Sequence, residues 1–295
     1  VLFLAGGLSR LGRRRAVATG LLMGAIALGA ALAMPSGAMA QPQKAGDSFA
    51  LDATTQTRLG YVVTGNAEAD EVSRAGLGGL ATFLGQRTAL QAGEPMGVDI
   101  ARDELSFFPL LYWPILPSTP MPSPAALARV NAFMKQGGTV IFDTRDALEA
   151  AGPNAPLTPA ARRLREILSA LDVPELEPVP RDHVLTKAFY LLKDFPGRFT
   201  GSSTWVEALP AVRDGDDRPA RAGDGVSPVI ITGNDLAGAW AVTPAGDPML
   251  PLTPGEPRQR EMAFRTGVNI AMYVLTGNYK ADQVHVPALL ERLGQ

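Results

Sequence analysis

The chain has 295 residues, of which 46% are apolar, so it can bury a sizeable core and bulk disorder is excluded. It contains no cysteine and only two histidines, which excludes disulfides, thiolate chemistry and a zinc site built on several imidazoles. The net charge is −2, but residues 1–40 contain four arginines and no acid, which leaves 23 basic residues against 29 acidic ones. An acidic globule repels phosphate groups, and we therefore expect no nucleic-acid partner.

The first 40 residues have the composition of a membrane-targeting segment. Three arginines, Arg13 to Arg15, precede Ala16–Met34, a run of 19 residues without charge that is long enough to span a bilayer as a helix. The arginines should remain cytoplasmic, which places the later residues on the far side of the membrane. The segment is therefore either a lasting anchor or a signal peptide cleaved after Ala40, within "GAMAQ". Because the chain begins with Val1, we expect a fragment of a longer protein, or a non-standard start codon.

The first part of the globular region predicts a linker, a strand and a helix. Residues 41–57 are small and polar, as in a linker, and Arg58–Gly65 reads as a strand ending in a turn. Glu68–Leu84 has apolar residues at helical spacing, although three glycines each weaken a helix by about 1 kcal/mol relative to alanine. Leu105–Ile115 is almost wholly apolar and predicts a strand covered on both faces, in which Pro109 indicates an edge or a bulge.

The middle of the chain alternates helices and strands. Ser123 and Thr158 each precede a proline, which is typical of a helix N-terminus, and a glycine pair after residue 136 ends the first of these helices. The expected strands that follow are Thr139–Phe142, Phe189–Leu192 and Val206–Leu209.

Toward the end of the chain, Ser227–Asp235 predicts a buried strand and Ala239–Thr243 an antiparallel extension of it. Arg258–Leu275 has the clearest helical pattern. The alternation along the chain indicates an α/β fold with a mostly parallel sheet and helices on both faces. We expect residues 58–295 to form a single domain.

Polar residues follow three of the expected strands, at Thr64–Asn66, Asp143–Asp146 and Thr232–Asp235. Parallel strands bring their carboxyl ends to one edge of the sheet, where ligands bind in open α/β folds. We therefore select a ligand site from these groups: Asp143, Arg145, Asp146, Asn234 and Asp235. Arg145 could clamp a carboxylate at two points, and the acids could accept amines. The alternative is that strand ends are polar only because they meet water.

Signals for other chemistry are weak. The chain has no G-x-S-x-G elbow, since "TGSSTW" at residues 200–205 lacks that frame, and no phosphate-binding glycine loop. Asp143, Asp146 and Asp235 could offer oxygen ligands to Mg²⁺ or Ca²⁺, but their spacing matches no ion-binding loop. His183 is expected to be a loop or capping residue. We therefore predict no metal, no cofactor and no catalytic residue.

Several stretches resemble an uncharacterised bacterial family, a domain of unknown function. They are "RLGYVVTGNAEADEVSRAGLGGL", "RDELSFFPLLYWPI", "GGTVIFDTRD", "PVIITGNDLAGAWA" and "RTGVNIAMYVLTGNYKADQVHVPALLERLG". The resemblance covers about residues 57–295 and implies an origin C-terminal to a BatA-like, aerotolerance-regulator membrane module. It also implies a flavodoxin-like fold of the class I glutamine amidotransferase type. Those enzymes place a cysteine after a strand, whereas this chain has Asp143 and Thr144 there, so the resemblance implies the fold and not the reaction.

These observations favour a membrane-tethered or exported domain of the cell envelope that binds a protein partner or a small polar ligand. The expected location is the bacterial inner membrane with the domain in the periplasm, or the periplasm itself after cleavage. The alternative function is a cell-envelope hydrolase in which Asp143 or Asp146 activates a water molecule. A third interpretation is a scaffold whose rim residues are purely structural.

Overall fold

A computed structural model of the chain describes residues 47–149, 156–208 and 225–276. Nearly all of them belong to one compact unit that begins at Ser48. The expected membrane segment, Ala16–Met34, and the candidate cleavage site at Ala40 lie outside the described residues. Among the helices within the described ranges, none combines the length and apolar character needed to cross a membrane.

The centre of the unit is a mixed sheet of seven strands in the order β2-β1-β3-β4-β7-β6-β5. Neighbours from β2 to β7 run parallel, whereas β6 is antiparallel to both β7 and β5. The strands are β1 (Gly60–Val62), β2 (Met96–Val98), β3 (Leu110–Pro114), β4 (Thr139–Asp143), β5 (Leu176–Pro178), β6 (Trp205–Glu207) and β7 (Val229–Thr232). The prediction of an α/β fold with a mostly parallel sheet is therefore confirmed.

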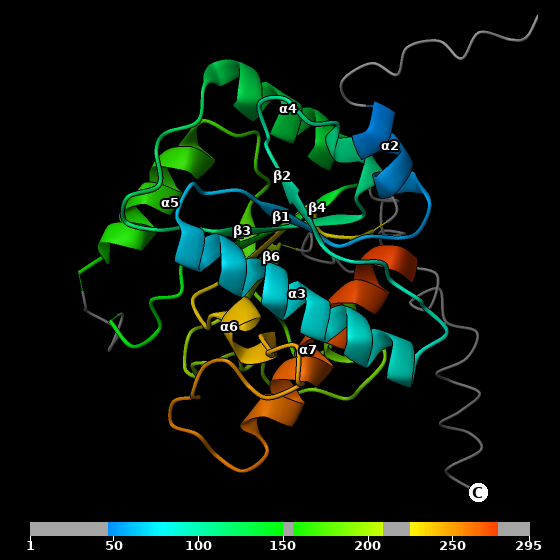
Figure 1. Cartoon of the computed structure of the whole chain (residues 1–295). Helices are drawn as coiled ribbons and strands as arrows, with labels where there is room; N and C mark the ends of the chain where they lie inside the picture. Colours follow the sequence, from blue (N-terminus) through cyan, green and yellow to red (C-terminus); the bar gives the residue numbers. More distant parts are fainter. Residues whose placement is uncertain (1–46, 150–155, 209–224, 277–295) are drawn as a thin grey trace, which may run out of the picture. The chain divides into compact units, whose positions relative to one another are not determined.

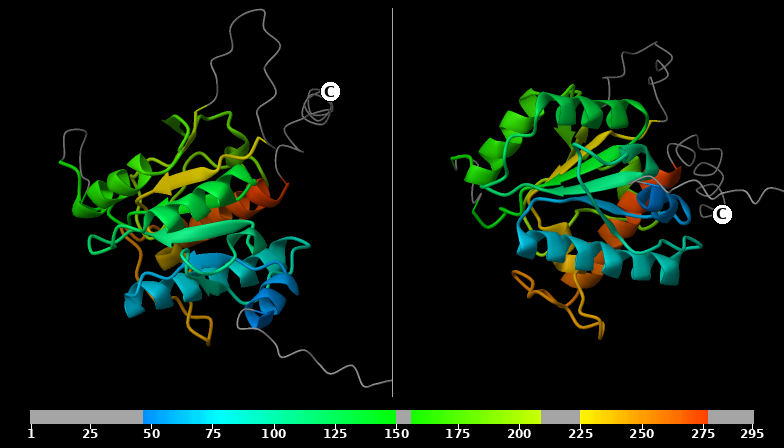
Figure 2. Two further views of the ribbon diagram at one scale, coloured as in Figure 1. Left: turned by 90° about the horizontal axis from the view of Figure 1, so that it is seen from above. Right: turned by 45° about the horizontal axis from the view of Figure 1, so that its top comes forward.

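Helices cover both faces of the sheet, as Figures 1 and 2 show. One face packs against α3, α6 and α7, and the other against α2, α4 and α5. The helices are α2 (Asp47–Thr54), α3 (Ala67–Arg87), α4 (Pro124–Lys135), α5 (Pro159–Ser169), α6 (Leu236–Trp240) and α7 (Gln259–Thr276), with single 3₁₀ turns η1 (Leu105–Phe107) and η2 (Val184–Thr186).

The central strands are apolar on both faces because both faces are covered. In β3, Tyr112 points into the core beneath α3, α6 and α7, while Leu111 and Trp113 point into the core beneath α4 and α5. All five residues of β3 and all five of β4 are buried. Alternate side chains therefore supply two separate cores, as the two-residue period of a strand requires.

The predicted helix starts are confirmed. Ser123 and Thr158 cap α4 and α5, and each hydroxyl accepts a hydrogen bond from the backbone N–H three residues later. Gly137, which follows α4, has a φ of 95°, a conformation that favours glycine.

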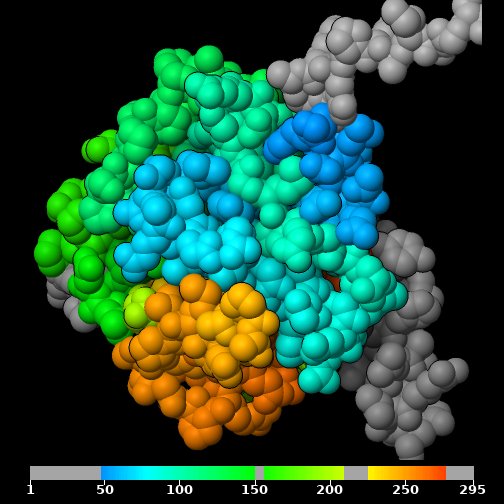
Figure 3. Space-filling view, in the orientation of Figure 1, coloured from blue at the N-terminus to red at the C-terminus, as the bar shows by residue number. Residues whose placement is uncertain are grey.

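Two of the glycines in α3 are explained by its packing against α6. A methyl group on Gly76 would lie 2.3 Å from the carbonyl oxygen of Ala237, and one on Gly79 would lie 2.1 Å from that of Trp240. The loss of helix propensity is thus offset by a close approach of two backbones. In the space-filling view, the cyan residues of α3 border the orange residues that follow α6 in the chain (Figure 3).

Within the predicted linker, residues 41–57, the structure has a helix, α2, at Asp47–Thr54. Ala53 is buried in the core beneath α4, and the Phe49 ring lies 6.1 Å from that of Phe108. These two apolar contacts hold a short helix whose sequence is otherwise small and polar. Pro109 is also misread, because it immediately precedes β3, a central strand, and a residue in that position need not donate to the ladder.

Two predicted strands are absent from the described residues. Phe189–Leu192 forms a turn because the Asn269 side chain bonds to both the N–H and the C=O of Tyr190, at 2.7 and 2.8 Å, in place of a neighbouring strand. Ala239–Thr243 does not extend the sheet, since residues 236–240 form α6, which is buried on all sides. The apolar residues of this stretch therefore reflect the complete burial of α6 and not a strand.

Candidate functional site

The carboxyl ends of β4 and β7 lie side by side because the two strands are parallel neighbours, with Asp143 paired to Thr232. This arrangement brings Asp143, Arg145 and Asp235 into direct contact, as the sequence predicts. We call these three residues, with Tyr112 and Arg198, the rim network.

Asp143 lies at the centre of the rim network and is 0% exposed. Its Oδ1 accepts hydrogen bonds from the backbone N–H groups of Arg145 and Asp235, at 3.0 and 3.1 Å. Its Oδ2 accepts from the N–H of Leu236 and the hydroxyl of Tyr112, at 2.7 and 3.0 Å. Both oxygens are thus fully engaged by the protein, and two of their donors are backbone N–H groups at the N-terminus of α6.

Asp235 is held between two arginines. Its Oδ1 lies 3.0 Å from Nε of Arg145, its Oδ2 lies 3.3 Å from Nη1 of Arg198, and its side chain is 1% exposed. Oδ1 also accepts from the N–H of Gly238 and so caps α6. Arg145 and Asp235 both have left-handed backbones, with φ of 56° and 53°. Such conformations are uncommon outside glycine, although aspartate adopts them more readily than arginine, and here the two side chains are joined by the ion pair.

The electrostatics of the rim network follow from its burial. Removal from water, followed by the nearby Asp235 carboxylate, raises the pKa of Asp143 from 3.8 to about 7, while hydrogen bonds from Leu236, Arg145 and Tyr112 oppose the rise. Burial and the adjacent carboxylates raise the pKa of Tyr112 well above its ordinary value, so its hydroxyl keeps its proton. The Asp235 carboxylate contacts two guanidinium groups, so its charge is already paired within the protein.

The other two predicted residues also bind within the protein. Asp146 accepts hydrogen bonds from the hydroxyls of Thr144 and Thr158, the second of which caps α5. Asn234 donates to the carbonyls of Phe195 and Ser202, at 2.9 and 3.0 Å, and accepts from the Ser202 N–H at 3.1 Å. Asp146 therefore fixes the start of α5, and Asn234 fixes a loop between η2 and β6.

The third polar strand end, Thr64–Asn66, does not join the rim network. It follows β1, which β3 separates from β4. Its polar groups bond to the first turn of α3, the helix that follows: Asp70 accepts from Thr64 and from the Gly65 N–H, and Asn66 caps α3.

A cavity of about 330 Å³ adjoins Asn234 at the same carboxyl edge, where β5 and β7 end and β6 begins. We call it the rim pocket. Five of its polar side chains form no hydrogen bond or ion pair within the described ranges: Lys193, Asp194, Thr200, Ser203 and Thr204. The pocket thus has the free hydrogen-bonding groups that the rim network lacks. The stretch "TGSSTW" lacks a serine elbow, but as a Gly-Ser loop beside a strand it was the available sequence signal for this pocket.

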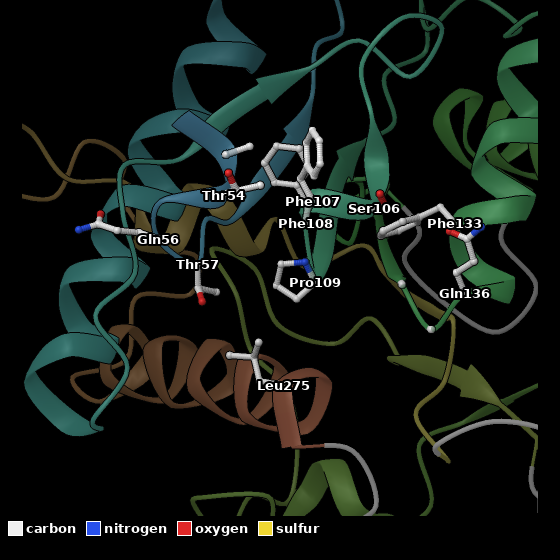
Figure 4. Close-up of a pocket in the computed structure, with 13 residues that line it drawn as sticks. Thr54, Gln56, Thr57, Ser106, Phe107, Phe108, Pro109, Phe133, Gln136 and Leu275 are labelled. Carbon is white, nitrogen blue, oxygen red and sulfur yellow. The ribbon is translucent and has the colours of Figure 1, made fainter. Parts of the chain in front are cut away.

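A second cavity, of about 600 Å³, lies at the opposite, amino edge of the sheet (Figure 4). We call it the amino-edge groove. Its walls come from the end of α2, the residues before β3, the end of α4 and the end of α7. The lining residues are Ala53, Thr54, Gln56, Thr57, Ser106, Phe107, Phe108, Pro109, Phe133, Gln136, Gly137, Gly138 and Leu275, none of which carries a charge.

The structure also tests the interpretation of His183. His183 is a capping residue, as predicted: it is 5% exposed and its Nδ1 accepts from the Leu185 N–H. Within the described residues, no three His, Asp or Glu side chains are grouped so that they could hold a metal ion. His285 lies outside the described ranges.

Comparison with known proteins gives one family. Residues 58–275 match the model described as Domain of unknown function (DUF4159). No curated protein matches the chain.

Proposed function

The chain belongs to the DUF4159 family, and we propose that its domain is a non-catalytic binding module of the bacterial cell envelope. The observation that carries the proposal is a difference between two groups of residues at the carboxyl edge of the sheet. The charged residues there bind one another, whereas the neighbouring rim pocket presents hydroxyl, ammonium and carboxylate groups that have no partner among the residues the structure describes. A pocket of this size and polarity suits a small polar ligand.

We further propose that the fold is flavodoxin-like, of the class I glutamine amidotransferase type. The order β2-β1-β3-β4-β7 supports this, because flavodoxin-like sheets have the order 2-1-3-4-5. The end of β4, where the amidotransferases would carry their cysteine, is occupied here by Asp143 and by Thr144, which follows it. Since the chain has no cysteine, the proposed relationship extends to the fold and not to amide transfer.

The binding proposal assigns the rim residues two different roles. Asn234 lines the rim pocket and holds the loop that forms its wall. The remaining rim residues have a structural role. Hydrogen bonds and an ion pair made by Asp143, Arg145, Asp146 and Asp235 join the ends of β4 and β7 to the starts of α5 and α6. The ligand contacts are therefore proposed to come mainly from Lys193, Asp194, Thr200, Ser203 and Thr204, with Asn234 in support.

A hydrolase of cell-envelope material is the alternative function. It would need Asp143 or Asp146 to activate a water molecule, and a general base must reach that water directly. Asp143 has no exposed surface, and both oxygens of each carboxylate accept hydrogen bonds from the protein. This geometry favours binding over hydrolysis.

The proposed location is the periplasmic side of the inner membrane, or the periplasm after cleavage at Ala40. Its support is the sequence: three arginines followed by the uncharged run Ala16–Met34. A BatA-like membrane module as partner, and a protein partner in the envelope, are proposals that rest on the family resemblance.

A ligand screen with matched variants tests the proposal. Amino acids, dipeptides and amino sugars would be added singly to the purified domain, with the unfolding temperature and the fluorescence of Trp205, next to Thr204 and 39% exposed, as readouts. Thr204→Val should weaken binding of a hit by about five- to thirtyfold, because a lost hydrogen bond in a pocket costs roughly 1–2 kcal/mol. Ser106→Ala, at the amino edge, is the control and should leave binding unchanged.

Two outcomes would contradict the proposal. Binding that is indifferent to every rim-pocket substitution would place the site elsewhere. Turnover of a hit that Asp146→Asn abolishes in a folded protein would support the hydrolase instead.

A further inference from the structure

The amino-edge groove is separate from the rim pocket and has no role in the proposed function. Three of its lining residues are aromatic, Phe107, Phe108 and Phe133, and we call them its aromatic floor. The amides of Gln56 and Gln136 lie on opposite sides of the groove (Figure 4). Uncharged amides and glycine backbone can bond to a peptide main chain, while an aromatic floor accepts apolar side chains. The groove therefore suits an uncharged apolar peptide segment better than a charged metabolite.

The chain itself contains such a segment directly after α7, the helix whose end forms part of the groove wall. Leu275 lines the groove and is 37% exposed, and it is the penultimate residue of α7. The 19 residues that follow, 277–295, include "VPALL" at Val286–Leu290, a stretch without charge.

The spacing in this segment also fits a groove. Val286, Leu289, Leu290 and Leu293 are at positions i, i+3, i+4 and i+7, which is the pattern of a helix with one apolar face. Pro287 suits the first turn of such a helix. Glu291 and Arg292 would lie on the other face, toward water.

The length of the connection permits a return to the groove. Val286 is 11 residues beyond Leu275, and a chain of that length can span up to about 35 Å. Because Leu275 is itself part of the groove wall, the segment has to turn back only a short distance.

We propose that the amino-edge groove is the docking site of the chain's own C-terminal segment, with Val286, Leu289, Leu290 and Leu293 packed against its aromatic floor. The segment then covers the amino edge of the sheet and shields Leu275 from water. A second copy of the chain or another protein would be a different occupant.

The absence of cysteine allows a direct test in the full-length chain, purified in a mild detergent. Gln136→Cys places a single thiol on the exposed wall of the groove, and its rate of reaction with a maleimide is measured. Adding Leu289→Asp and Leu290→Asp should speed the reaction about tenfold, because charges on the apolar face release the segment. The matched control, Glu291→Ala with Arg292→Ala on the opposite face, should leave the rate unchanged.

The same experiment identifies the other occupants. A rate that is equal with and without the two aspartates overturns the proposal, as does protection that disappears on dilution, which indicates a second copy. Gln56→Cys, on the opposite wall, repeats the measurement if Gln136→Cys does not fold. Protection at either thiol that is independent of concentration and relieved by the two aspartates supports docking of the chain's own segment.

Discussion

The two edges of the sheet differ in what their polar and apolar groups are free to do. At the carboxyl edge the rim network is rich in charge, yet its carboxylates are buried and bonded to the protein. At the amino edge the groove has no charge, yet Leu275 is more than a third exposed. The difference teaches that the type of a residue at a strand end is a poor guide to binding, and that uncommitted hydrogen-bonding groups and exposed apolar surface are better guides.

The largest expected effect is that of Asp143→Ala. It leaves three backbone N–H groups and the Tyr112 hydroxyl without an acceptor and removes a carboxylate from a buried charge cluster. We expect a loss of about 3–5 kcal/mol in the free energy of unfolding, measured with urea. Ser106→Ala, exposed at the amino edge, should change it by less than about 0.5 kcal/mol. If Asp143→Ala lost no more unfolding free energy than Ser106→Ala, the proposed structural difference between the carboxyl and amino edges would be contradicted.

A glycine pair tests how rigidly α6, whose N-terminus binds Asp143, is held. Gly79→Ala should cost about 1–3 kcal/mol of unfolding free energy, because its methyl group would lie 2.1 Å from the backbone oxygen of Trp240. Gly78→Ala, one residue earlier, has only Pro95 within 4 Å and should stabilise the domain by up to about 1 kcal/mol. Thermal unfolding of the two variants, compared with the parent chain, should show shifts of opposite sign. Equal shifts would contradict the close approach of α3 and α6.

The pH dependence of stability should carry the signature of Asp143. Its pKa in the folded state is raised to about 7 from 3.8, so the fold favours the protonated group. That contribution is fully present below the unfolded pKa and is lost as the pH rises through about 7. Urea unfolding at a series of pH values should therefore show the parent chain losing stability between about pH 4 and 7 relative to Asp143→Asn. A difference that grows in the opposite direction would mean that the hydrogen bonds from the backbone outweigh burial.

The smallest expected effect concerns Thr266, in the middle of α7. Its side chain is 0% exposed, and its hydroxyl is one of two buried side-chain polar atoms without a partner in the described residues. Thr266→Val removes the unpaired hydroxyl at nearly constant volume and should stabilise the domain by about 0.5–1 kcal/mol. Differential scanning calorimetry can measure this shift. A destabilised variant would indicate that the hydroxyl has a partner in the folded chain.

Much of the fold was predictable because its signals are local. The caps at Ser123 and Thr158 and the apolar runs of β3, β4 and β7 each follow from a few neighbouring residues. The errors arise where distant residues decide the outcome. Asn269 bonds the backbone of Tyr190 and prevents a strand, and α6 is helical within a fully buried stretch.

The candidate site was predictable in one respect and not in another. The order of strands brought Asp143, Arg145 and Asp235 together, as expected from a parallel sheet. The sequence could not indicate that these residues would satisfy one another, since that depends on the left-handed turns at Arg145 and Asp235 and on Arg198 from another loop. Nor could it show that the loop after Lys193 closes a pocket against Asn234.

The most direct test of the account compares two aspartates at the carboxyl edge by urea unfolding. Asp235→Asn keeps the size of the side chain and tolerates the left-handed backbone, but it removes the charge that Arg145 and Arg198 bind. Asp194→Asn makes the same chemical change on an exposed residue of the rim pocket. We expect the free energy of unfolding to fall by several kcal/mol for Asp235→Asn and by less than about 0.5 kcal/mol for Asp194→Asn. Equal stability of the two variants would contradict it.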